Sequence, residues 1–377
     1  MISYQFRLYP TTEHIEALNQ QLDTHRWLYN QALEQRKTAW EEKKESIGYN
    51  QQAGWLTKER ETNEYLTQVN VSSCQRTLKR LDRAFQSFFG RIKTGETPGY
   101  PRFKGRNRFD SFEFTYSDGI KIKGDTLYIQ HIGHVEICLH RAIEGKIKTA
   151  IIKRKANQWF VCFSVECESH TQSNTGQCVG LDMGVKNLVT TSDGEFFSHP
   201  KHLRQSERNL RCAQRKVSRR EKGSHRRQKA VIELKKVHEQ IANQRRDTSH
   251  KIARSLVNRY DLIAVEDLQV KNMMQNHSLA KSIADASWST FINILSFKAE
   301  DAGRQVVKVD PKYTSQACSR CGEIVQKDLS VRIHECLHCG LTLDRDVNAA
   351  KNVLKKALRG WTIPSGVNVE VVNSCVS

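Results

Sequence analysis

The sequence contains no uninterrupted apolar run of 18 residues, and acidic side chains are scarce beside basic ones. Without such a run no membrane-spanning helix is expected, and the basic segments lack the strongly apolar opposite face of a helix that lies on a membrane. The opening MISYQFRLYP does not fit a secretory signal peptide. The 41 Asp and Glu against 60 Lys and Arg give a formal net charge of +19. A charge of this sign and size points to a polyanionic partner, most simply nucleic acid.

Cysteine occurs eleven times, but seven of these residues are scattered without a pattern that would indicate a disulfide framework. Such a distribution fits a reducing compartment, so we expect a cytoplasmic protein. The other four form two Cys-x2-Cys pairs, Cys318 with Cys321 and Cys336 with Cys339, separated by fourteen residues. Two disulfides or four unrelated thiols are the competing interpretation, but the spacing favours one tetrahedral zinc ion in a zinc ribbon. A site closed by four sulfurs has no open position, so this zinc is structural and catalysis must occur elsewhere.

The first half of the chain combines a helical block with short strands. The 377 residues suffice for two or three domains. Alternating apolar residues predict a strand over the first ten residues, helical spacing predicts helices over 11–94, and period two over 109–168 predicts short strands. Closely spaced short strands indicate a small barrel, which the first strand completes, with the helical block as an insertion. The turn at 95–105 contains Arg102 and Lys104 between aromatic residues, and it fits a nucleic-acid contact and an ordinary surface loop equally well.

The second half begins with an apolar strand that contains Asp182, followed by a hairpin turn at 192–194. A later apolar strand, Leu262 to Val265, is followed directly by Glu266. The next segment, KNMMQNHSLAKS, has few apolar anchors and is expected to be a mobile loop beside a site. A helix from about Ile283 to Gly303 and a strand over 305–309 are expected to precede the ribbon.

The basic charge is concentrated between residues 201 and 260, where nineteen Lys and Arg stand against five Asp and Glu. The spacing is helical and is interrupted near Gly223. A solvated helix face is the usual explanation of a charge run. Here the imbalance is too one-sided for mutual salt bridges, so we expect a surface that follows phosphates. Together with the 95–105 turn, it provides the predicted nucleic-acid contacts, which are Arg102, Lys104, Arg215, Lys216, Arg219, Arg220, Arg226 and Arg227.

Three acidic residues occupy places that fit a metal-dependent nuclease. Asp182 lies in a strand, Glu266 at the end of a later strand and Asp346 at the start of a late helix. An RNase H-like α/β core gathers carboxylates at one sheet edge in this order, and a buried aspartate needs a partner or a metal. Hard oxygen ligands hold Mg²⁺, and two such ions about 4 Å apart can activate water and stabilise the leaving oxygen of a phosphodiester. The sequence therefore predicts a two-magnesium site at these residues.

The segment around Asp344 and Asp346 has a second interpretation. Both aspartates precede NAAKNVLKKAL, which has helical spacing, and acidic residues at a helix start commonly cap the helix and complement its dipole. Taken alone, this segment favours capping over catalysis. The acidic residues Asp182 and Glu266 elsewhere in the chain shift the interpretation towards a metal site.

The chain resembles the TnpB proteins encoded by bacterial insertion sequences, which are similar to type V CRISPR effector nucleases. GLDMGVKNLVTTSDG, IAVEDLQVKNM and DRDVNAAKNVL resemble the three split RuvC motifs, and the four-cysteine ribbon lies beside the third. RLYPTTEH, RWLYNQAL, PGYPRFKGR and VSRREKGSHRR extend the resemblance over nearly the whole chain. Two small departures from the family pattern are Met183, which stands between the aspartate and the glycine where other apolar residues are usual, and the short tail after Leu358.

The resemblance implies an RNA-guided double-stranded DNA endonuclease. Such a protein binds a structured guide RNA from the transposon end, reads a short flanking motif and cuts target DNA at one magnesium-dependent RuvC site. It is expected to act as one monomer per RNA in a bacterial or archaeal cell, with Asp182, Glu266 and Asp346 as catalytic carboxylates and Asp344 as a helix cap. The chain then divides into the first strand of a wedge barrel at 1–10, a helical recognition domain at 11–94, the rest of the barrel at 95–177, the RuvC core with its basic helices at 178–317, the zinc ribbon at 318–340, the last RuvC helix at 341–358 and a short tail at 359–377.

Two other functions fit the same family. A guide-dependent DNA-binding repressor arises when the carboxylates are lost, and all three are present here. An unguided transposase would use the same carboxylates for strand transfer, or a His-x-His pair with a tyrosine. The sequence contains no His-x-His.

Overall fold

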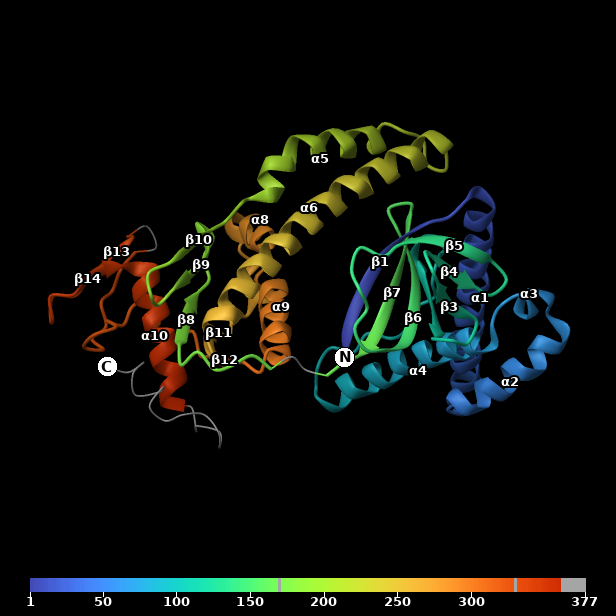
Figure 1. Cartoon of the computed structure of the whole chain (residues 1–377), viewed down its shortest axis with the longest axis horizontal. Coiled ribbons are helices and arrows are strands. Elements are labelled where there is room, and N and C mark those ends of the chain that lie inside the picture. Colours follow the sequence, from blue (N-terminus) through green and yellow to red (C-terminus); the bar gives the residue numbers. More distant parts are fainter. Residues whose placement is uncertain (169–170, 329–330, 361–377) are drawn as a thin grey trace. The chain divides into compact units, whose positions relative to one another are not determined.

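The computed structural model describes residues 1–168, 171–328 and 331–360. The chain divides into two compact units, Met1–Glu168 and Ser169–Ser377 (Figure 1). Of the expected tail at 359–377, residues 361–377 lie outside the described part. Within the described ranges, no helix combines the length and the apolar character that crossing a bilayer requires.

Most helices of the first unit bury apolar residues in one core with its sheet. The helices of this unit are α1 (Thr12–Lys43), α2 (Tyr49–Thr62), α3 (Glu64–Thr67), α4 (Val71–Lys93) and the short 3₁₀ helix η1 (Arg106–Arg108). Thr11 caps α1 by accepting a hydrogen bond from the backbone N–H of His14. Leu78, Leu81 and Phe85 of α4 are buried in the same core as the strands. The predicted helical block at 11–94 is therefore confirmed as helical.

The sheet of the first unit has seven antiparallel strands in the order β2-β6-β7-β1-β5-β4-β3. The strands are β1 (Ile2–Tyr9), β2 (Ser111–Thr115), β3 (Ile120–Lys123), β4 (Thr126–Ile129), β5 (Gly133–Cys138), β6 (Lys146–Lys155) and β7 (Gln158–Glu166). Tyr4, Phe6 and Leu8 alternate with more exposed residues, so one face of β1 enters the core. The expected barrel is nearly formed, because β1 joins the sheet between β7 and β5, but no ladder in the described residues joins the edge strands β2 and β3.

The sheet of the second unit has five strands in the order β10-β9-β8-β11-β12. They are β8 (Cys178–Asp182), β9 (Asn187–Thr191), β10 (Phe196–Ser198), β11 (Leu262–Glu266) and β12 (Gln305–Val309). β11 is parallel to both β8 and β12, whereas β9 is antiparallel to β8 and β10. The apolar runs of β8 and β11 are buried, as expected of strands covered on both faces.

Helices of the second unit cover this sheet and extend from it. They are α5 (His202–Ser218), α6 (His225–Arg259), α7 (Val270–Met273), α8 (His277–Ala286), α9 (Trp288–Asp301) and α10 (Arg345–Gly360). Side chains of α6, α8 and α9 share a core with Val179, Leu181, Ile263 and Val265. Two expectations are wrong here. The segment expected to be a loop contains α7 and most of α8, and the expected helix at 283–303 is broken at Ser287, whose φ of 53° ends α8.

The other face of the sheet packs closely against α10. Ala264 and Val309 of the sheet share a core with Val353 and Ala357 of α10. A Cβ atom built on Gly180 would lie 2.1 Å from the carbonyl oxygen of Ala350. Only glycine permits this approach of helix backbone to strand. The close packing fixes α10 over the strands that carry Asp182 and Glu266.

Candidate active site and zinc site

Asp182 and Glu266 are the last residues of two adjacent parallel strands. In the register of β8 and β11, Leu181 lies opposite Val265, so the two acidic residues follow at the same level. Because side chains alternate along a strand, they face the same side as Gly180 and Ala264, which is the side that α10 covers. The carboxyl ends of these strands therefore present two carboxylates on one face.

Asp346 reaches this edge from the first turn of α10, whereas Asp344 caps the helix. The Oδ1 atom of Asp344 accepts hydrogen bonds from the backbone N–H groups of Asp346 (2.9 Å) and Val347 (3.2 Å). This arrangement confirms Asp344 as the cap. Because Asp344 accepts these N–H groups, the carboxylate of Asp346 is left for other contacts, and its Oδ1 atom lies 3.9 Å from Arg332 Nη1.

The three carboxylates interact electrostatically. Burial raises the pKa of Asp182 well above its ordinary value, and the charges of Glu266 and Asp346 raise it further. Burial also raises the pKa of Asp346, and the neighbouring Asp344 adds to this effect. Like charges brought together in a partly buried site disfavour ionisation unless a cation compensates them. The structure thus brings Asp182, Glu266 and Asp346 within electrostatic reach of one another.

Glu266 is the most buried of the three, with 6% of its surface exposed. Thr314 donates a hydrogen bond from Oγ1 to Glu266 Oε1 over 2.6 Å. Burial raises the pKa of Glu266, while the Thr314 hydroxyl and the charge of Lys356 act in the opposite direction. Thr314 was not predicted as a site residue, because nothing in the local sequence links it to a glutamate 48 positions away.

Oxygen donors of this kind fit a hard divalent cation. Asp182, Glu266 and Asp346 offer anionic oxygens whose mutual repulsion a cation would relieve, and Mg²⁺ prefers carboxylate ligands with retained waters. Their oxygens do not converge as tightly as the cysteine sulfurs. In the described part of the chain, the four ribbon cysteines are the one set of three or more His, Cys, Asp or Glu residues whose possible ligand atoms all lie within 4.8 Å of one another.

That group consists of Cys318, Cys321, Cys336 and Cys339. The Sγ atoms of Cys318 and Cys339 are 3.6 Å apart, and so are those of Cys321 and Cys336. Four sulfurs bound at about 2.3 Å to one tetrahedral ion lie about 3.8 Å from one another, whereas disulfide-bonded sulfurs are about 2.05 Å apart. The cysteines are therefore not paired as disulfides, and they fit a Zn²⁺ ion.

The local fold places these sulfurs on two turns. The second pair lies between β13 (Ile333–Glu335) and β14 (Thr342–Asp344), which form a two-stranded antiparallel sheet. Burial raises the pKa of the Cys318 thiol, but hydrogen bonds that include the backbone N–H groups of Cys321 and Arg320 outweigh it and lower the pKa to about 5. A thiolate at this position is the form that binds zinc. The strand β14 leads directly into α10, so the ribbon is joined to the helix that carries Asp346.

Comparison with known proteins places the chain in a family. Three family models match, described as "Probable transposase" at 161–277, "Cas12f1-like, TNB domain" at 288–353 and "Helix-turn-helix domain" at 1–45. A protein of Streptomyces pristinaespiralis named "Putative RNA-guided DNA endonuclease" is 34% identical over 373 residues, which cover 97% of this chain and 91% of that protein. The chain belongs to the TnpB (IS605 OrfB) family.

Other relatives match most of the chain at lower identity. "Putative RNA-guided DNA endonuclease InsQ" of Escherichia coli (strain K12) is 29% identical, covering 93% of this chain and 91% of that protein. "CRISPR-associated endodeoxyribonuclease Cas12f1" of Sulfoacidibacillus thermotolerans is 24% identical over 82% of each chain. A solved structure described as the mini-RNA-guided endonuclease CRISPR-Cas_phi3 has a TM-score of 0.51 at 9% identity, covering 94% of this chain and 92% of that one. This last likeness is one of fold.

In this TnpB-family chain, the region matched as a helix-turn-helix domain has a different structure. Residues 1–45 contain the strand β1 and the single 32-residue helix α1. This segment therefore forms one strand and one long helix rather than two helices joined by a turn.

Six of the eight predicted nucleic-acid contacts are exposed, and the other two, Lys104 and Arg227, are half-buried. In the first unit, the loop that carries Arg102 is held by Asn30, which bonds the backbone N–H of Lys104 over 2.8 Å. In the second unit, Arg215 and Lys216 are in the last turn of α5, where cations complement the helix dipole. Arg226 and Arg227 are in the first turn of α6, where a positive charge interacts unfavourably with the helix dipole. The remaining two, Arg219 and Arg220, lie between the helices and are exposed.

Proposed function

We propose that this protein is an RNA-guided endonuclease of an insertion sequence that cuts double-stranded DNA beside a short flanking motif at a single RuvC site. The observation that carries the proposal is the placement of Asp182, Glu266 and Asp346 at one edge of a sheet, coupled electrostatically and covered by α10. The names of the relatives support the same activity. The strand order also supports an RNase H-like core. The antiparallel strands β10, β9 and β8 are continued by the parallel strands β11 and β12, and helices cover both faces of the sheet.

Asp182, Glu266 and Asp346 would hold two Mg²⁺ ions, which supply an activated water and stabilisation of the leaving oxygen in phosphodiester hydrolysis. The chain's own residues orient these ligands. Thr314 fixes one oxygen of Glu266, and the Asp344 cap fixes the first turn of α10 and with it Asp346. The contact at Gly180 fixes the distance between α10 and β8. This preorganisation leaves little side-chain rearrangement to the reaction itself.

Strongly basic surfaces outside the carboxylate site are suited to nucleic acid. Arg226 and Arg227 at the N-terminus of α6 cost helix stability unless an anion compensates them, and a phosphate backbone does so. We assign a structured guide RNA and target DNA as partners, with one protein monomer per RNA in the cytoplasm. The seven-stranded sheet would form the wedge domain at 1–10 and 95–177, and helices at 11–94 the recognition domain. Base pairing by the RNA then reads the sequence, while the protein reads the flanking motif.

A matched set of acidic variants tests the proposal. Asp182→Ala, Glu266→Ala and Asp346→Ala are each expected to lower cleavage of a matched plasmid in Mg²⁺ by at least about a thousandfold, because each removes a ligand of a shared metal site. Binding of the copurified RNA and of target DNA should change little. Asp344→Asn is the control, since asparagine caps a helix as well as aspartate does and the variant should still cut.

The proposal fails if the triple-alanine protein still cuts the plasmid. If the wild-type protein binds RNA and matched DNA without cutting, the protein is a guide-dependent repressor. Cutting or strand transfer that needs no RNA would instead identify an unguided transposase.

A further inference from the structure

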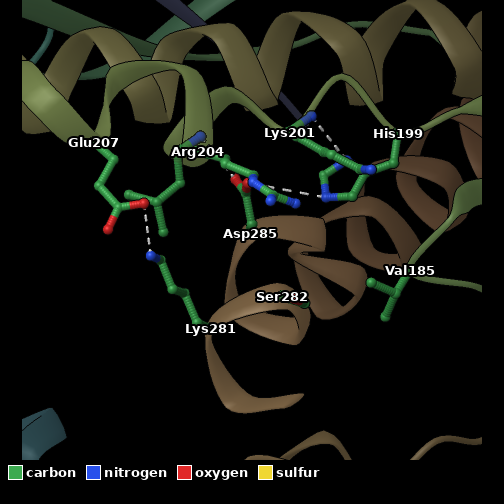
Figure 2. Close-up of a pocket in the computed structure, with 9 residues that line it drawn as sticks. Val185, His199, Lys201, Arg204, Glu207, Lys281, Ser282 and Asp285 are labelled. Atoms are coloured by element: carbon green, nitrogen blue, oxygen red, sulfur yellow. Dashed lines mark hydrogen bonds and ion pairs between the residues drawn. The ribbon is translucent and has the colours of Figure 1, made fainter. Parts of the chain in front are cut away.

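A cavity of about 320 Å³ lies in the second unit, apart from the three carboxylates. It is formed by the turn after β8, the segment between β10 and α5, the start of α5, and α8 (Figure 2). Its side chains are mostly charged. The balance of these charges indicates what the cavity can bind.

Asp285 is one of the two carboxylates in the cavity wall, and it is fully compensated. Its Oδ1 atom accepts hydrogen bonds from Arg245 Nε (2.9 Å) and from the backbone N–H of Leu203 (3.1 Å), and Arg245 Nη2 lies 2.8 Å away. Asp285 is 5% exposed and joins α8 to α6 and to the first turn of α5. It thus builds the wall of the cavity and contributes little net negative charge to it.

Glu207, the other carboxylate, is shared by two cations. Lys281 Nζ lies 2.7 Å from Glu207 Oε2, and Arg211 Nη2 lies 3.2 Å from Oε1. Figure 2 shows Lys281 and Glu207 joined at one side of the cavity. Lys201 and Arg204 also line the cavity, and no carboxylate among the described residues forms an ion pair with either. The cavity therefore has a net positive charge.

His199 provides a buried hydrogen-bond donor in the wall. Its side chain is 4% exposed, and its Nδ1 accepts from the backbone N–H of Lys201 over 3.4 Å. The neutral ring then carries its proton on Nε2. Burial lowers the pKa of His199, which favours this neutral form. The Nε2 atom is 4.0 Å from Asp285 Oδ2, longer than a hydrogen bond, so the donor is left for a ligand oxygen or nitrogen.

We propose that this cavity binds one unstacked nucleotide of the guide RNA. Lys201 and Arg204 contact its phosphate, and His199 Nε2–H donates to its base or ribose. The volume of about 320 Å³ is at the lower end of the range for small-ligand sites, which fits a single nucleotide better than a duplex. The inference rests on the proposed function, because it requires that the protein holds a guide RNA.

RNA is favoured over duplex DNA because a nucleotide must be unstacked before it can enter the cavity. Proteins recognise structured RNA through nucleotides that are splayed out of loops and bulges, where the base is already unstacked. A nucleotide of duplex DNA would have to be flipped out at a cost of a few kcal/mol before it entered the cavity. The cavity also adjoins α5, whose exposed arginines continue the positive surface along which an RNA backbone can pass.

The test uses the full-length protein with the RNA that copurifies with it. The 2′-hydroxyl reactivity of each RNA nucleotide is mapped in complexes of the wild-type protein, of Lys201→Ala/Arg204→Ala, and of Ser282→Phe, which fills the cavity without changing charge. Arg208→Ala/Arg254→Ala is the matched control. It removes the same charge from exposed positions of α5 and α6 outside the cavity.

In the wild-type complex we expect at least one nucleotide in a loop or bulge to be protected. Both cavity variants should make it at least about fivefold more reactive, whereas the control should leave it protected and only weaken binding in a salt-dependent way. An unchanged reactivity map in both cavity variants overturns the inference. An unchanged map with weaker binding of target DNA also overturns it, and assigns the cavity to DNA.

Failure of the proposed function gives a different result. In that case no RNA copurifies, or matched DNA is not cut in Mg²⁺ by the wild-type complex. If the wild-type complex cuts and the cavity variants have an unchanged map, only the cavity assignment is wrong.

Discussion

Thr314 donates a 2.6 Å hydrogen bond to Glu266, a residue 48 positions earlier in the chain. The same Thr314 hydroxyl also contacts the carbonyl oxygen of Pro311 at 2.9 Å. The Thr314 carbonyl oxygen in turn accepts from Asn352 Nδ2 of α10 over 2.8 Å. One threonine thus connects the acidic end of β11 to the helix that carries Asp346. The position of a proposed metal ligand depends on a residue outside the three acidic motifs.

Replacing this threonine tests its effect on Glu266. In Thr314→Val the pKa of Glu266 rises further, because the hydroxyl that opposes the effect of burial is removed. A smaller fraction of Glu266 is then ionised at each pH, so the acidic limb of the cleavage profile moves to higher pH. Near neutral pH we expect cleavage to fall about 10- to 100-fold, since a hydrogen bond to a charged group contributes about 1.5–3 kcal/mol. The rate of plasmid cutting against pH measures this, and Thr314→Ser should retain the wild-type profile.

The acidic site is expected to lower the stability of the metal-free protein. The pKa of Asp182 is higher in the folded protein than in the unfolded chain. At pH values between these two pKa values, the folded state therefore binds more protons than the unfolded state. Stability therefore falls as the pH rises through this window. Asp182→Asn removes the repulsion, and in Mg²⁺-free buffer without a chelator, which leaves the ribbon zinc in place, it should raise the unfolding temperature at neutral pH by a few degrees. The difference should shrink at acidic pH, and a variant less stable than wild type at both pH values contradicts the argument.

The ribbon predicts one zinc ion per chain. Cys318→Ser/Cys336→Ser removes one sulfur from each pair and should reduce the zinc content from about one to near zero, measured by elemental analysis of purified protein. Cys212→Ser, at an exposed cysteine outside the ribbon, is the control and should keep its zinc. Because the ribbon continues into α10, loss of zinc should also lower cleavage. Unchanged zinc content in the double variant would refute the assignment.

Gly180 is expected to tolerate no side chain. In Gly180→Ala the new Cβ meets the carbonyl oxygen of Ala350 at 2.1 Å and the backbone nitrogen of Leu354 at 2.7 Å. Backbone atoms cannot rotate away as a side chain does, so α10 must shift, at a cost of about 2–3 kcal/mol of unfolding free energy. Denaturant titration measures the cost, and cleavage should fall with it because Asp346 moves. Gly54→Ala is the control, since a Cβ atom at Gly54 in α2 would meet no atom within 4 Å apart from its own helix backbone, and it should be neutral or slightly stabilising.

Much of the fold follows from local patterns. The alternation in β1 and the helical spacing of α4 are visible in the sequence because burial of one face imposes a period on the residues. The exception at 271–282 has a physical reason. α7 and α8 are short helices, of which α8 is capped by Asn276, and each has few apolar side chains, so the periodic signal is too weak to predict them.

The cavity beside α5 was also missed, although a signal was present. Asp285 stands in the otherwise apolar stretch IADASW, a position where a buried acid requires compensating partners. The partners Arg245 and Leu203 come from α6 and α5, and no local pattern identifies them.

The sequence by itself determined which residue types this protein offers for chemistry. The two Cys-x2-Cys pairs, the acid at the end of each buried strand and the basic segment are each encoded within a few consecutive residues, because ligand spacing and periodic burial are local properties. Only the tertiary structure decided which of them meet. Asp182, Glu266 and Asp346 approach one another because parallel pairing of β8 with β11 and the contact of α10 at Gly180 bring together segments that are distant in the chain. It also confirmed the expected capping by Asp344 rather than Asp346, a choice that depends on the orientation of two carboxylates around one helix end.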